Sequence, residues 1–516
     1  MYLTQGVHRS VQINGDGVAT SFKGRKRSWR EFADRVARLA GALRALGVGP
    51  GDRVSMLGHN SDRYVEHYYA VFWLGAVAVP VNTRWSLAEI LYSFDDSTPS
   101  VLLFDDGFVD QAASLREQTQ SPRQYIFAGE GAAPDWAHDY ERLIAEAAPV
   151  EDVRRGGDAL AAIMYTGGTT GSPKGVMLSH AGLVSSVMSM ATVIDPSAHS
   201  TFLHAAPLFH IAAAGLMFIA TVFGGCHVIV PGFSPASICD VIASEEVTDL
   251  LLVPTMVKML IDHCDANGGD LSVIRRLLYG ASPMPEAVLR RAMTAMPDAQ
   301  FLNGYGMTEL SSGITVLGPE YHKLDGDTSK LRSAGRALPG IDIKIASDNG
   351  NELPRGETGE VWVRGPSALM GYWNKPDVTA ATMVDGWVRT GDAAYMDEDG
   401  FLFIVDRVKD MIISGGENVY SAEVENAVLK HPAVADCAVI GVPDDQWGER
   451  VHAIIVPRAG QSVTLDALIE HCRPLIAGYK CPRSYEVREV PLPLSAAGKV
   501  LKAELRAPFW TKEGAA

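Results

Sequence analysis

A segment rich in glycine and threonine at residues 165–175 contains the residue types that bind a polyphosphate. It reads YTGGTTGSPKG. Its glycines allow successive backbone N–H groups to converge on an anion, its hydroxyls add donors, and Lys174 adds a positive charge. The segment is not a Walker A loop, because Pro173 precedes Lys174 and no Ser or Thr follows the lysine. A surface linker has a similar composition, so the rest of the chain must decide between the two.

A second cluster, NGYGMTE, occupies residues 303–309. Tyr305 offers a flat ring for a nucleobase, Asn303 an amide for its edge, Thr308 a hydroxyl for a phosphate and Glu309 a hard oxygen ligand for Mg²⁺. A surface turn before a helix would explain the glycines equally well.

Two further candidates lie toward the C-terminus. Asp392 follows a strand-like segment at 387–389, and a carboxylate there could accept hydrogen bonds from ribose hydroxyls. Lys499 follows Gly498 in a Pro- and Gly-containing segment. An ordinary turn aspartate and a solvated lysine are the alternatives for these two residues.

The elements that must position these residues alternate between strand and helix. A capping box at Ser28 and Glu31 predicts a helix that ends near Gly47. Strands are predicted at 52–57, 76–81, 101–104, 250–253 and 274–279, and helices at 64–74, 86–93, 181–190, 211–223 and 257–264. This order predicts an α/β protein with doubly wound, largely parallel sheets.

The pattern changes after about residue 333. Short β-like runs separated by Asn-Gly, Arg-Gly and Asp-Gly turns predict a small β-rich subdomain over about 333–405. A compact α+β unit follows the charged run at 406–410, which we interpret as a hinge. The predicted organisation is a large N-terminal domain over 1–408 and a small mobile C-terminal domain over 409–516.

Composition excludes several other classes of protein. The 516 residues carry a formal net charge of −16, which argues against a general binder of nucleic acid or anionic membranes. The six cysteines form no C-x-x-C pair, and reduced thiols are expected. No signal peptide or stretch long enough to span a bilayer is recognised, so a cytoplasmic protein without an integral membrane segment is expected.

Taken together, these motifs resemble the adenylate-forming enzymes, and specifically the ATP-dependent, AMP-forming acyl-CoA synthetases. The resemblance covers nearly the whole chain in the family's order. It also includes Pro-Leu-Phe-His at 207–210, Gly-Ala-Ser-Pro at 280–283 and the run at 406–418. Several motifs in order are far more specific than any one of them.

The resemblance implies a role for each matching residue. The catalytic residues would be Lys499, which bridges the carboxylate and the α-phosphate, Thr308 at the α-phosphate and Glu309 as the Mg²⁺ ligand. ATP would be bound by Thr166, Gly167, Gly168, Thr169, Thr170, Gly171, Lys174, Gly280, Ala281, Ser282, Asn303, Gly304, Tyr305, Asp392 and Arg407. The acyl pocket would include His210, Gly280, Gly304 and Met307, the hinge Lys409, and the CoA side Ser414, Gly415 and Gly416.

The implied reaction uses ATP, Mg²⁺ and coenzyme A. A carboxylic acid becomes an acyl-adenylate with release of pyrophosphate, and the acyl group then passes to CoA with release of AMP. The resemblance leaves open an acyl-AMP ligase that loads a separate carrier protein, a luciferase-like oxygenase and a nucleotide-binding regulator without catalysis. The oligomeric state also stays open, a homodimer included.

The resemblance also bears on the acid. Family members that activate amino acids hold the ammonium group with an aspartate in the segment equivalent to 207–210. This chain has Phe209 and His210 there, and small apolar residues follow. In the family this histidine is typical of enzymes for fatty or aryl acids, although a histidine satisfied within the core is the alternative. An apolar acid without an α-amino group is therefore expected.

One position departs from the family, because Gly167 stands where serine is usual. The glycine keeps the backbone N–H but lacks the hydroxyl donor. We therefore expect Gly167→Ser to lower the KM for ATP while activity persists in both proteins. Steady-state kinetics with varied ATP measures this, and an unchanged or higher KM would contradict it.

Overall fold

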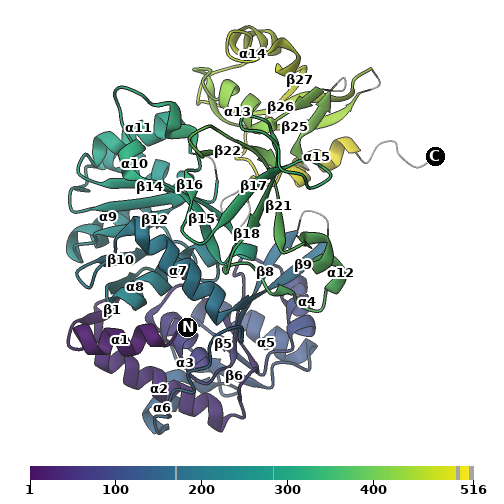
Figure 1. The fold of residues 1–516 in the computed structure, drawn as a ribbon. Coiled ribbons are helices and arrows are strands. Elements are labelled where there is room, and N and C mark those ends of the chain that lie inside the picture. Colours follow the sequence, from purple (N-terminus) through teal and green to yellow (C-terminus); the bar gives the residue numbers. More distant parts are fainter. Residues whose placement is uncertain are drawn as a thin grey trace. The chain divides into compact units, whose positions relative to one another are not determined.

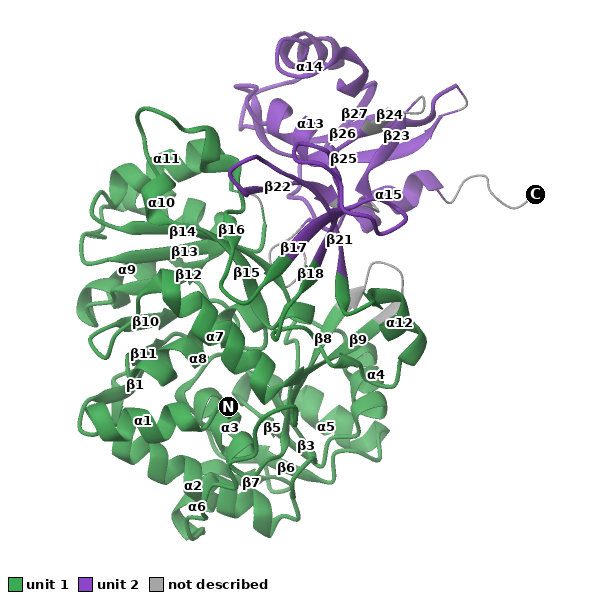
Figure 2. Cartoon of the chain, in the orientation of Figure 1, with its two compact units in different colours: residues 1–342, 363–388 green, residues 343–362, 389–516 purple. Residues whose placement is uncertain are grey.

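The computed structural model describes residues 1–168, 171–282, 284–407, 410–414, 417–444, 446–494 and 500–510. The side chains of residues 167, 168, 171, 172, 407, 417 and 418 lie outside this description. The chain divides into two compact units, which Figure 2 shows in green and purple. Unit 1 comprises residues 1–342 and 363–388, and unit 2 comprises residues 343–362 and 389–516.

The first large sheet of unit 1 has nine strands in the order β16-β15-β14-β13-β12-β10-β11-β1-β2. Its central neighbours, from β14 through β13, β12, β10 and β11 to β1, are parallel, and its outer pairs are antiparallel. The strands are β1 (Val18–Phe22), β2 (Arg25–Ser28), β10 (Thr201–His204), β11 (Cys226–Ile229), β12 (Asp249–Leu252), β13 (Arg276–Gly280), β14 (Gln300–Met307), β15 (Ser312–Leu317) and β16 (Arg336–Ala337).

The second large sheet has eight strands in the order β19-β9-β8-β4-β3-β5-β6-β7. It is parallel from β8 to β7, and the β8–β9 and β9–β19 pairs are antiparallel. The strands are β3 (Arg53–Leu57), β4 (Val77–Pro80), β5 (Val101–Phe104), β6 (Gln124–Phe127), β7 (His138–Asp139), β8 (Leu160–Gly168), β9 (Gly171–Ser179) and β19 (Gly371–Tyr372). Two mainly parallel α/β sheets confirm the predicted fold class.

Helices pack against both sheets of unit 1 (Figure 1). The capping box predicted at Ser28 and Glu31 is present and starts the second helix. The helices are α1 (Gln5–Asn14), α2 (Trp29–Ala45), α3 (Asp62–Trp73), α4 (Leu87–Ser97), α5 (Val109–Gln118), α6 (Tyr140–Glu146), α7 (His180–Ile194), α8 (Ile211–Phe223), α9 (Pro235–Ser244), α10 (Pro254–Asn267), α11 (Glu286–Ala295) and α12 (Pro376–Thr382). No helix among the described residues has the length and apolar character needed to cross a bilayer.

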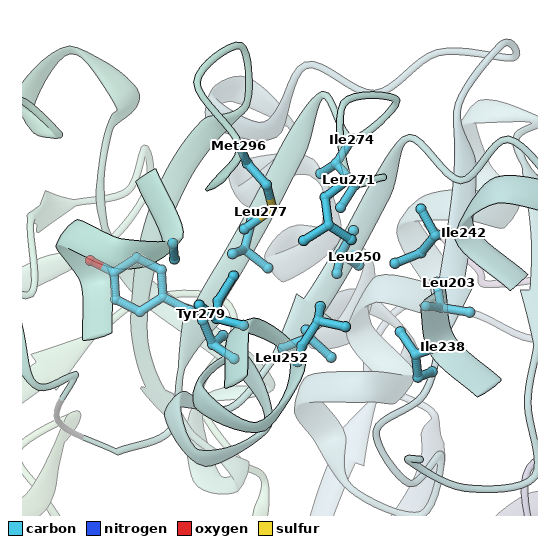
Figure 3. Close-up of a cluster of buried hydrophobic side chains, with 14 of the residues drawn as sticks. Leu203, Ile238, Ile242, Leu250, Leu252, Leu271, Ile274, Leu277, Tyr279 and Met296 are labelled. Carbon is cyan, nitrogen blue, oxygen red and sulfur yellow. The ribbon is translucent and has the colours of Figure 1, made fainter. Parts of the chain in front are cut away.

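A buried apolar cluster fills one side of the nine-stranded sheet (Figure 3). Leu250, Leu252, Leu277 and Tyr279 come from neighbouring parallel strands, and Ile238 comes from α9. Neighbouring parallel strands whose inward residues are Leu and Tyr need a helical cover, which explains their apolar sequences. The core thereby fixes the strand ends that carry the candidate site.

The division between the units runs through a smaller sheet, in the order β17-β18-β21-β20 with β22 beside β21. Its strands are β17 (Asp342–Ala346), β18 (Gly359–Arg364), β20 (Met383–Val384), β21 (Trp387–Met396) and β22 (Leu402–Arg407). The predicted β-rich segment therefore forms a sheet. Strand β21 continues through Asp392 to Met396, whereas the sequence predicted that strand to end at 389, because its second half pairs with β22 across a register shift between Ala393 and Ala394.

The last part of unit 2 is an α+β body. Its sheet has the order β24-β23-β26-β25 with β27 beside β26. The elements are β23 (Ile412–Ser414), β24 (Glu417–Val419), α13 (Ser421–Val428), β25 (Val434–Asp444), β26 (Gly448–Pro457), α14 (Leu465–Cys472), β27 (Ser484–Val487) and α15 (Lys502–Trp510). The domain boundary at 408/409 falls on residues outside the description and stays a prediction.

Candidate active site

The proposed phosphate segment lies at the end of the β8–β9 hairpin. Thr166 is opposite Lys174 and Gly168 is opposite Gly171, and the register shifts between Thr166 and Gly168. Strand β8 is anchored just before this hairpin end, because the Tyr165 hydroxyl donates to Asp96 Oδ2 at 2.6 Å. Antiparallel pairing thus places Thr166 and Lys174, which are eight positions apart, side by side.

Tyr372 links this hairpin to the 303–309 segment. Lys174 Nζ lies 5.6 Å from the centre of the Tyr372 ring, and the Tyr372 hydroxyl donates to Glu309 Oε1 at 2.9 Å. Strand β19 positions the tyrosine by pairing Tyr372 with Val176. Burial, followed by the neighbouring Glu309 charge, raises the pKa of Tyr372, so the hydroxyl keeps its proton at neutral pH.

Sequence reasoning missed Tyr372. It follows a glycine at a position where the sequence carries no catalytic motif, and only the antiparallel pairing of β9 with β19 brings it to the site.

The predicted adenine-binding residues lie at the ends of β13 and β14. Gly280 is opposite Gly304, and a Cβ added to Gly280 would lie 2.1 Å from the Gly304 carbonyl oxygen. Only glycine permits this approach. Ala281 directly after the strand has φ +64°, a conformation that a non-glycine residue rarely adopts and that is frequent at functional sites.

The remaining residues of this cluster differ in exposure. Tyr305, Met307 and Thr308 are half-buried, whereas Glu309 is only 7% exposed. The Asn303 side-chain amide donates to the Ser333 carbonyl at 3.0 Å, which holds that side chain against the next segment. The structure therefore brings 280–282, 303–309 and Lys174 into one region of unit 1.

A buried pair supports the end of β13 from below. His322 Nδ1 lies 2.9 Å from the Gly318 carbonyl and must donate to it, so its Nε2 accepts the hydrogen bond of the Tyr279 hydroxyl at 2.9 Å. Burial lowers the pKa of His322 to about 4, which keeps the ring neutral. The residue before Gly280 is thereby fixed.

His210 is the N-cap residue of α8, and its ring centre lies 4.3 Å from that of Phe209. The loop before it is held by Asn60, whose side chain accepts from Leu208 N at 2.8 Å and donates to the Ala206 carbonyl at 2.8 Å. This arrangement presents a half-buried histidine at the start of an apolar helix.

A small, partly open cavity of about 20 Å³, room for about one water molecule, lies between α7, α8 and the nine-stranded sheet. Its described lining has no ionisable side chain. Ser312, at one wall, has φ +123° and faces Gly215 of α8, where an added Cβ would lie 3.0 Å from Ser312 Oγ. The lining residues are Ser186, Val187, Met190, Ala212, Gly215, Leu216, Ile219, Leu251, Leu278 and Ser312.

In unit 2, Asp392 and Arg407 occupy directly opposite positions on β21 and β22. Asp392 is 9% exposed, and its backbone N–H donates to Thr390 Oγ1 at 3.1 Å. The two predicted ribose-binding residues are therefore adjacent, although they are fifteen positions apart in the sequence.

Asp406, beside them, belongs to a buried network. Its Oδ2 accepts from the Ser421 hydroxyl at 2.6 Å and from the Ser421 backbone N–H. Ser421 Oγ also contacts Lys502 Nζ, which pairs with Glu425 Oε1 at 2.7 Å. This network fastens the end of β22 to α13 and α15. Ser414, predicted on the CoA side, is buried in β23 at the start of the same body.

Five predicted site residues lie outside the described residues. They are Thr169, Thr170, Lys409, Gly415 and Gly416, and the predicted catalytic residue Lys499 also lies outside the description, which makes six in all. Their roles stay predictions, as does that of the Arg407 side chain.

Glu309 suits the predicted magnesium ion. The described residues contain no group of three or more His, Cys, Asp or Glu side chains that could hold a metal by themselves. Mg²⁺ in nucleotide sites is commonly bound by one or two carboxylates together with substrate phosphates and water. A buried carboxylate beside a lysine-containing phosphate hairpin meets that requirement.

Known proteins resemble this chain over most of its length. A model of the AMP-binding enzyme family matches residues 7–373, and a model of the AMP-binding enzyme C-terminal domain matches residues 423–499. Feruloyl-CoA synthase of Amycolatopsis sp is 38% identical over 97% of this chain and 98% of its own length. Long-chain-fatty-acid–CoA ligase FadD13 of Mycobacterium tuberculosis is 36% identical over 92% of this chain and 91% of its own length.

A solved structure resembles the whole chain as well. The o-succinylbenzoate CoA synthetase MenE of Bacillus subtilis, in complex with an acyl-adenylate intermediate, is 32% identical with a TM-score of 0.85, over 99% of this chain and 98% of that one. The same enzyme has been solved with ATP and a magnesium ion.

Proposed function

The chain belongs to the AMP-binding enzyme family and is an AMP-forming acid–CoA ligase, and we propose that its acid is an aromatic carboxylic acid without an α-amino group. The observation that carries this proposal is the 38% identity to feruloyl-CoA synthase, and the uncharged lining of the cavity beside the candidate active site supports it. ATP, the acid and CoA are its small-molecule substrates.

The position of the cavity supports its assignment to the acyl group. It adjoins α8, which begins after His210, and β13, which ends at Gly280. Its wall also includes Ser312, three positions after Glu309. An acid whose carboxylate meets ATP near Gly280 and Thr308 would therefore extend its body into this cavity.

The uncharged lining of the cavity favours an acid that carries no charge beyond its carboxylate. With room for about one water molecule (about 20 Å³), the cavity can admit an acyl group only when its lining side chains move apart. An α-ammonium group would need a buried carboxylate, and the described lining offers none. The resemblance to feruloyl-CoA synthase supports the aromatic acid, whereas the resemblance to FadD13 and the mostly apolar lining favour a fatty acid as the second candidate.

In the first half-reaction the acid's carboxylate attacks the α-phosphorus of ATP. The nucleophile is already ionised at neutral pH, so no general base is needed. Thr166 and Lys174 would hold the β- and γ-phosphates, and Thr308 and Lys499 would stabilise the charge that develops at the α-phosphate. Glu309 would bind Mg²⁺, which neutralises phosphate charge when it is present.

In the second half-reaction CoA attacks the acyl-adenylate and AMP leaves. We assign Asp392 and Arg407 to the ribose of the nucleotide, Lys409 to the hinge, and Ser414, Gly415 and Gly416 to the CoA side. A cytoplasmic location and a homodimer stay predictions.

A panel of carboxylic acids tests the proposal by CoA-dependent AMP formation. We expect cinnamic and hydroxycinnamic acids to exceed long-chain fatty acids by about tenfold or more in kcat/KM, a ratio that differential pocket contacts can supply. Faster turnover of long-chain acids would favour the second candidate, and faster turnover of amino acids would overturn both.

The same panel with Ser312→Ala tests the cavity itself. Ser312 is the hydroxyl residue of the wall that lies three positions after Glu309, and its substitution would remove a hydrogen bond to a ring hydroxyl of the acid. Loss of about 1 kcal/mol predicts a roughly fivefold higher KM for a hydroxycinnamic acid and little change for cinnamic acid. An equal change in KM for both acids would show that Ser312 acts only on packing. The control is Thr192→Ala, on the exposed face of α7.

A further inference from the structure

Helices α9 and α10 bring two cysteines together at the edge of the apolar cluster of the nine-stranded sheet. The Sγ atoms of Cys239 and Cys264 lie 3.4 Å apart, and both side chains are half-buried. The two residues are twenty-five positions apart and belong to no C-x-x-C motif. Their proximity is a tertiary contact.

The surroundings hold the pair in place. Ile238 beside one cysteine is fully buried, and Ile261 on the other helix is 1% exposed (Figure 3 shows Ile238 within the cluster). Gly269 lies against both sulfurs, since an added Cβ would be 2.9 Å from Cys264 Sγ and 3.4 Å from Cys239 Sγ. The two helices are therefore fixed by their core residues while the sulfurs face each other.

We propose that Cys239 and Cys264 are an oxidation site that forms a reversible intramolecular disulfide with a disulfide oxidant such as oxidised glutathione. One thiolate attacks the oxidant and releases one glutathione thiol. The other thiolate then attacks the protein sulfur of the mixed disulfide and releases the second glutathione thiol. The two cysteines lose two protons and two electrons, and the oxidant is reduced to two thiols.

Bond formation requires a small movement. A disulfide has an S–S distance of about 2.0 Å, so the sulfurs must approach by roughly 1.4 Å, which side-chain rotation can supply. Burial raises the pKa of Cys264 to about 12, so little thiolate is present at neutral pH and the rate of oxidation should rise with pH.

The link would constrain the segment between the two helices. That segment contains β12, which contributes Leu251 to the proposed acyl cavity. Closing a loop across β12 restricts the unfolded chain and should stabilise unit 1 against unfolding.

Peptide mapping of the full-length protein tests the site directly. The reduced protein is incubated with excess oxidised glutathione, remaining thiols are alkylated, and the protein is digested with trypsin, which cleaves at Lys258 between the two cysteines. We expect a linked pair of peptides containing Cys239 and Cys264, lighter by two hydrogens and separated by dithiothreitol. Full alkylation of both cysteines, or a link between Cys472 and Cys481 instead, would overturn the proposal.

Variants separate this pair from Cys226 of β11, which lies in the same tryptic peptide as Cys239. Cys226→Ser should keep the linked peptides, and Cys239→Ser and Cys264→Ser should each lose them. Thermal unfolding gives a second readout, in which oxidation raises the midpoint of the wild type and of Cys226→Ser by a few degrees and leaves Cys239→Ser unchanged. If a serine variant does not fold, Cys239→Ala replaces it. A linked wild type with an unchanged midpoint would contradict the inferred constraint.

Discussion

Replacing Lys499 with alanine is expected to slow formation of the acyl-adenylate by about 10²–10³-fold, the usual effect of removing one contact to a developing charge. Two anions meet when the carboxylate attacks the α-phosphate, and Lys499 is the cation that the family resemblance assigns to that point. The family model of the C-terminal domain extends to this residue. On either side of segment 495–499 the chain is paired, since Leu494 bridges Val500 and Leu501 N donates to the Pro493 carbonyl at 2.9 Å.

The measurement separates the two half-reactions. Pyrophosphate–ATP exchange reports adenylation, and thioester formation from a synthetic acyl-adenylate and CoA reports the second step. Lys499→Ala should reduce the first and largely spare the second, whereas Lys430→Ala, an exposed lysine of the same unit, should match the wild type in both. Equal losses in the two steps would indicate a structural role for Lys499 and contradict the assignment.

Glu309→Gln is the second change with a large expected effect. It removes the buried carboxylate charge while keeping the shape of the side chain, so binding of Mg²⁺ with ATP should weaken. Loss of electrostatic stabilisation at the phosphates predicts a fall of about 10²–10³-fold in kcat for adenylation, with a higher magnesium concentration at half-maximal rate.

Two further variants sharpen this prediction. Tyr372→Phe removes the hydroxyl that donates to Glu309 Oε1 at 2.9 Å and should show a smaller loss in the same direction. Glu146→Gln breaks an exposed pair with Arg142 on α6 and should leave the rate within a few-fold of the wild type. A Glu309→Gln enzyme with an unchanged magnesium dependence would show that the carboxylate does not serve the metal.

Much of the fold was predictable because its signals are local. Helix α8 was predicted at 211–223 and has those bounds, and the capping box at Ser28 starts α2 where expected. Apolar strands of four to six residues between helices specify parallel sheets because both of their faces must be covered. The site motifs were also recognisable, since glycines and a lysine in one short run indicate phosphate binding.

The features that sequence analysis missed depend on contacts between segments that are far apart in the sequence. Tyr372 reaches Glu309 only because β19 pairs with β9, and Cys239 meets Cys264 only because α9 packs beside α10. Ser312 lines the cavity because Gly306 and Gly215 leave room for it, as an added Cβ on Gly306 would lie 1.8 Å from the Ser312 carbonyl oxygen. Periodicity carries no information about such contacts between segments.

The sheet through which the division between the units runs limits how the protein can move. The chain crosses from one unit to the other at 342/343, 362/363 and 388/389, along strands of a single hydrogen-bonded sheet. Rotation about this division would need all three chain connections to twist at once, and it would break the hydrogen bonds between strands of the sheet. A domain can rotate freely only where a single chain segment connects it to the rest of the protein.

A single connecting segment is found after β22, where the chain leads from Arg407 to the sheet that contains β23. We therefore infer that the pivot lies there, at the predicted hinge residue Lys409, and that the small sheet stays with the part of the chain that precedes it. The bonds from Asp406 to Ser421 cross this pivot, so a full turn must exchange them for others. Breaking of the Asp406–Ser421 hydrogen bonds would then accompany the change between the two half-reactions.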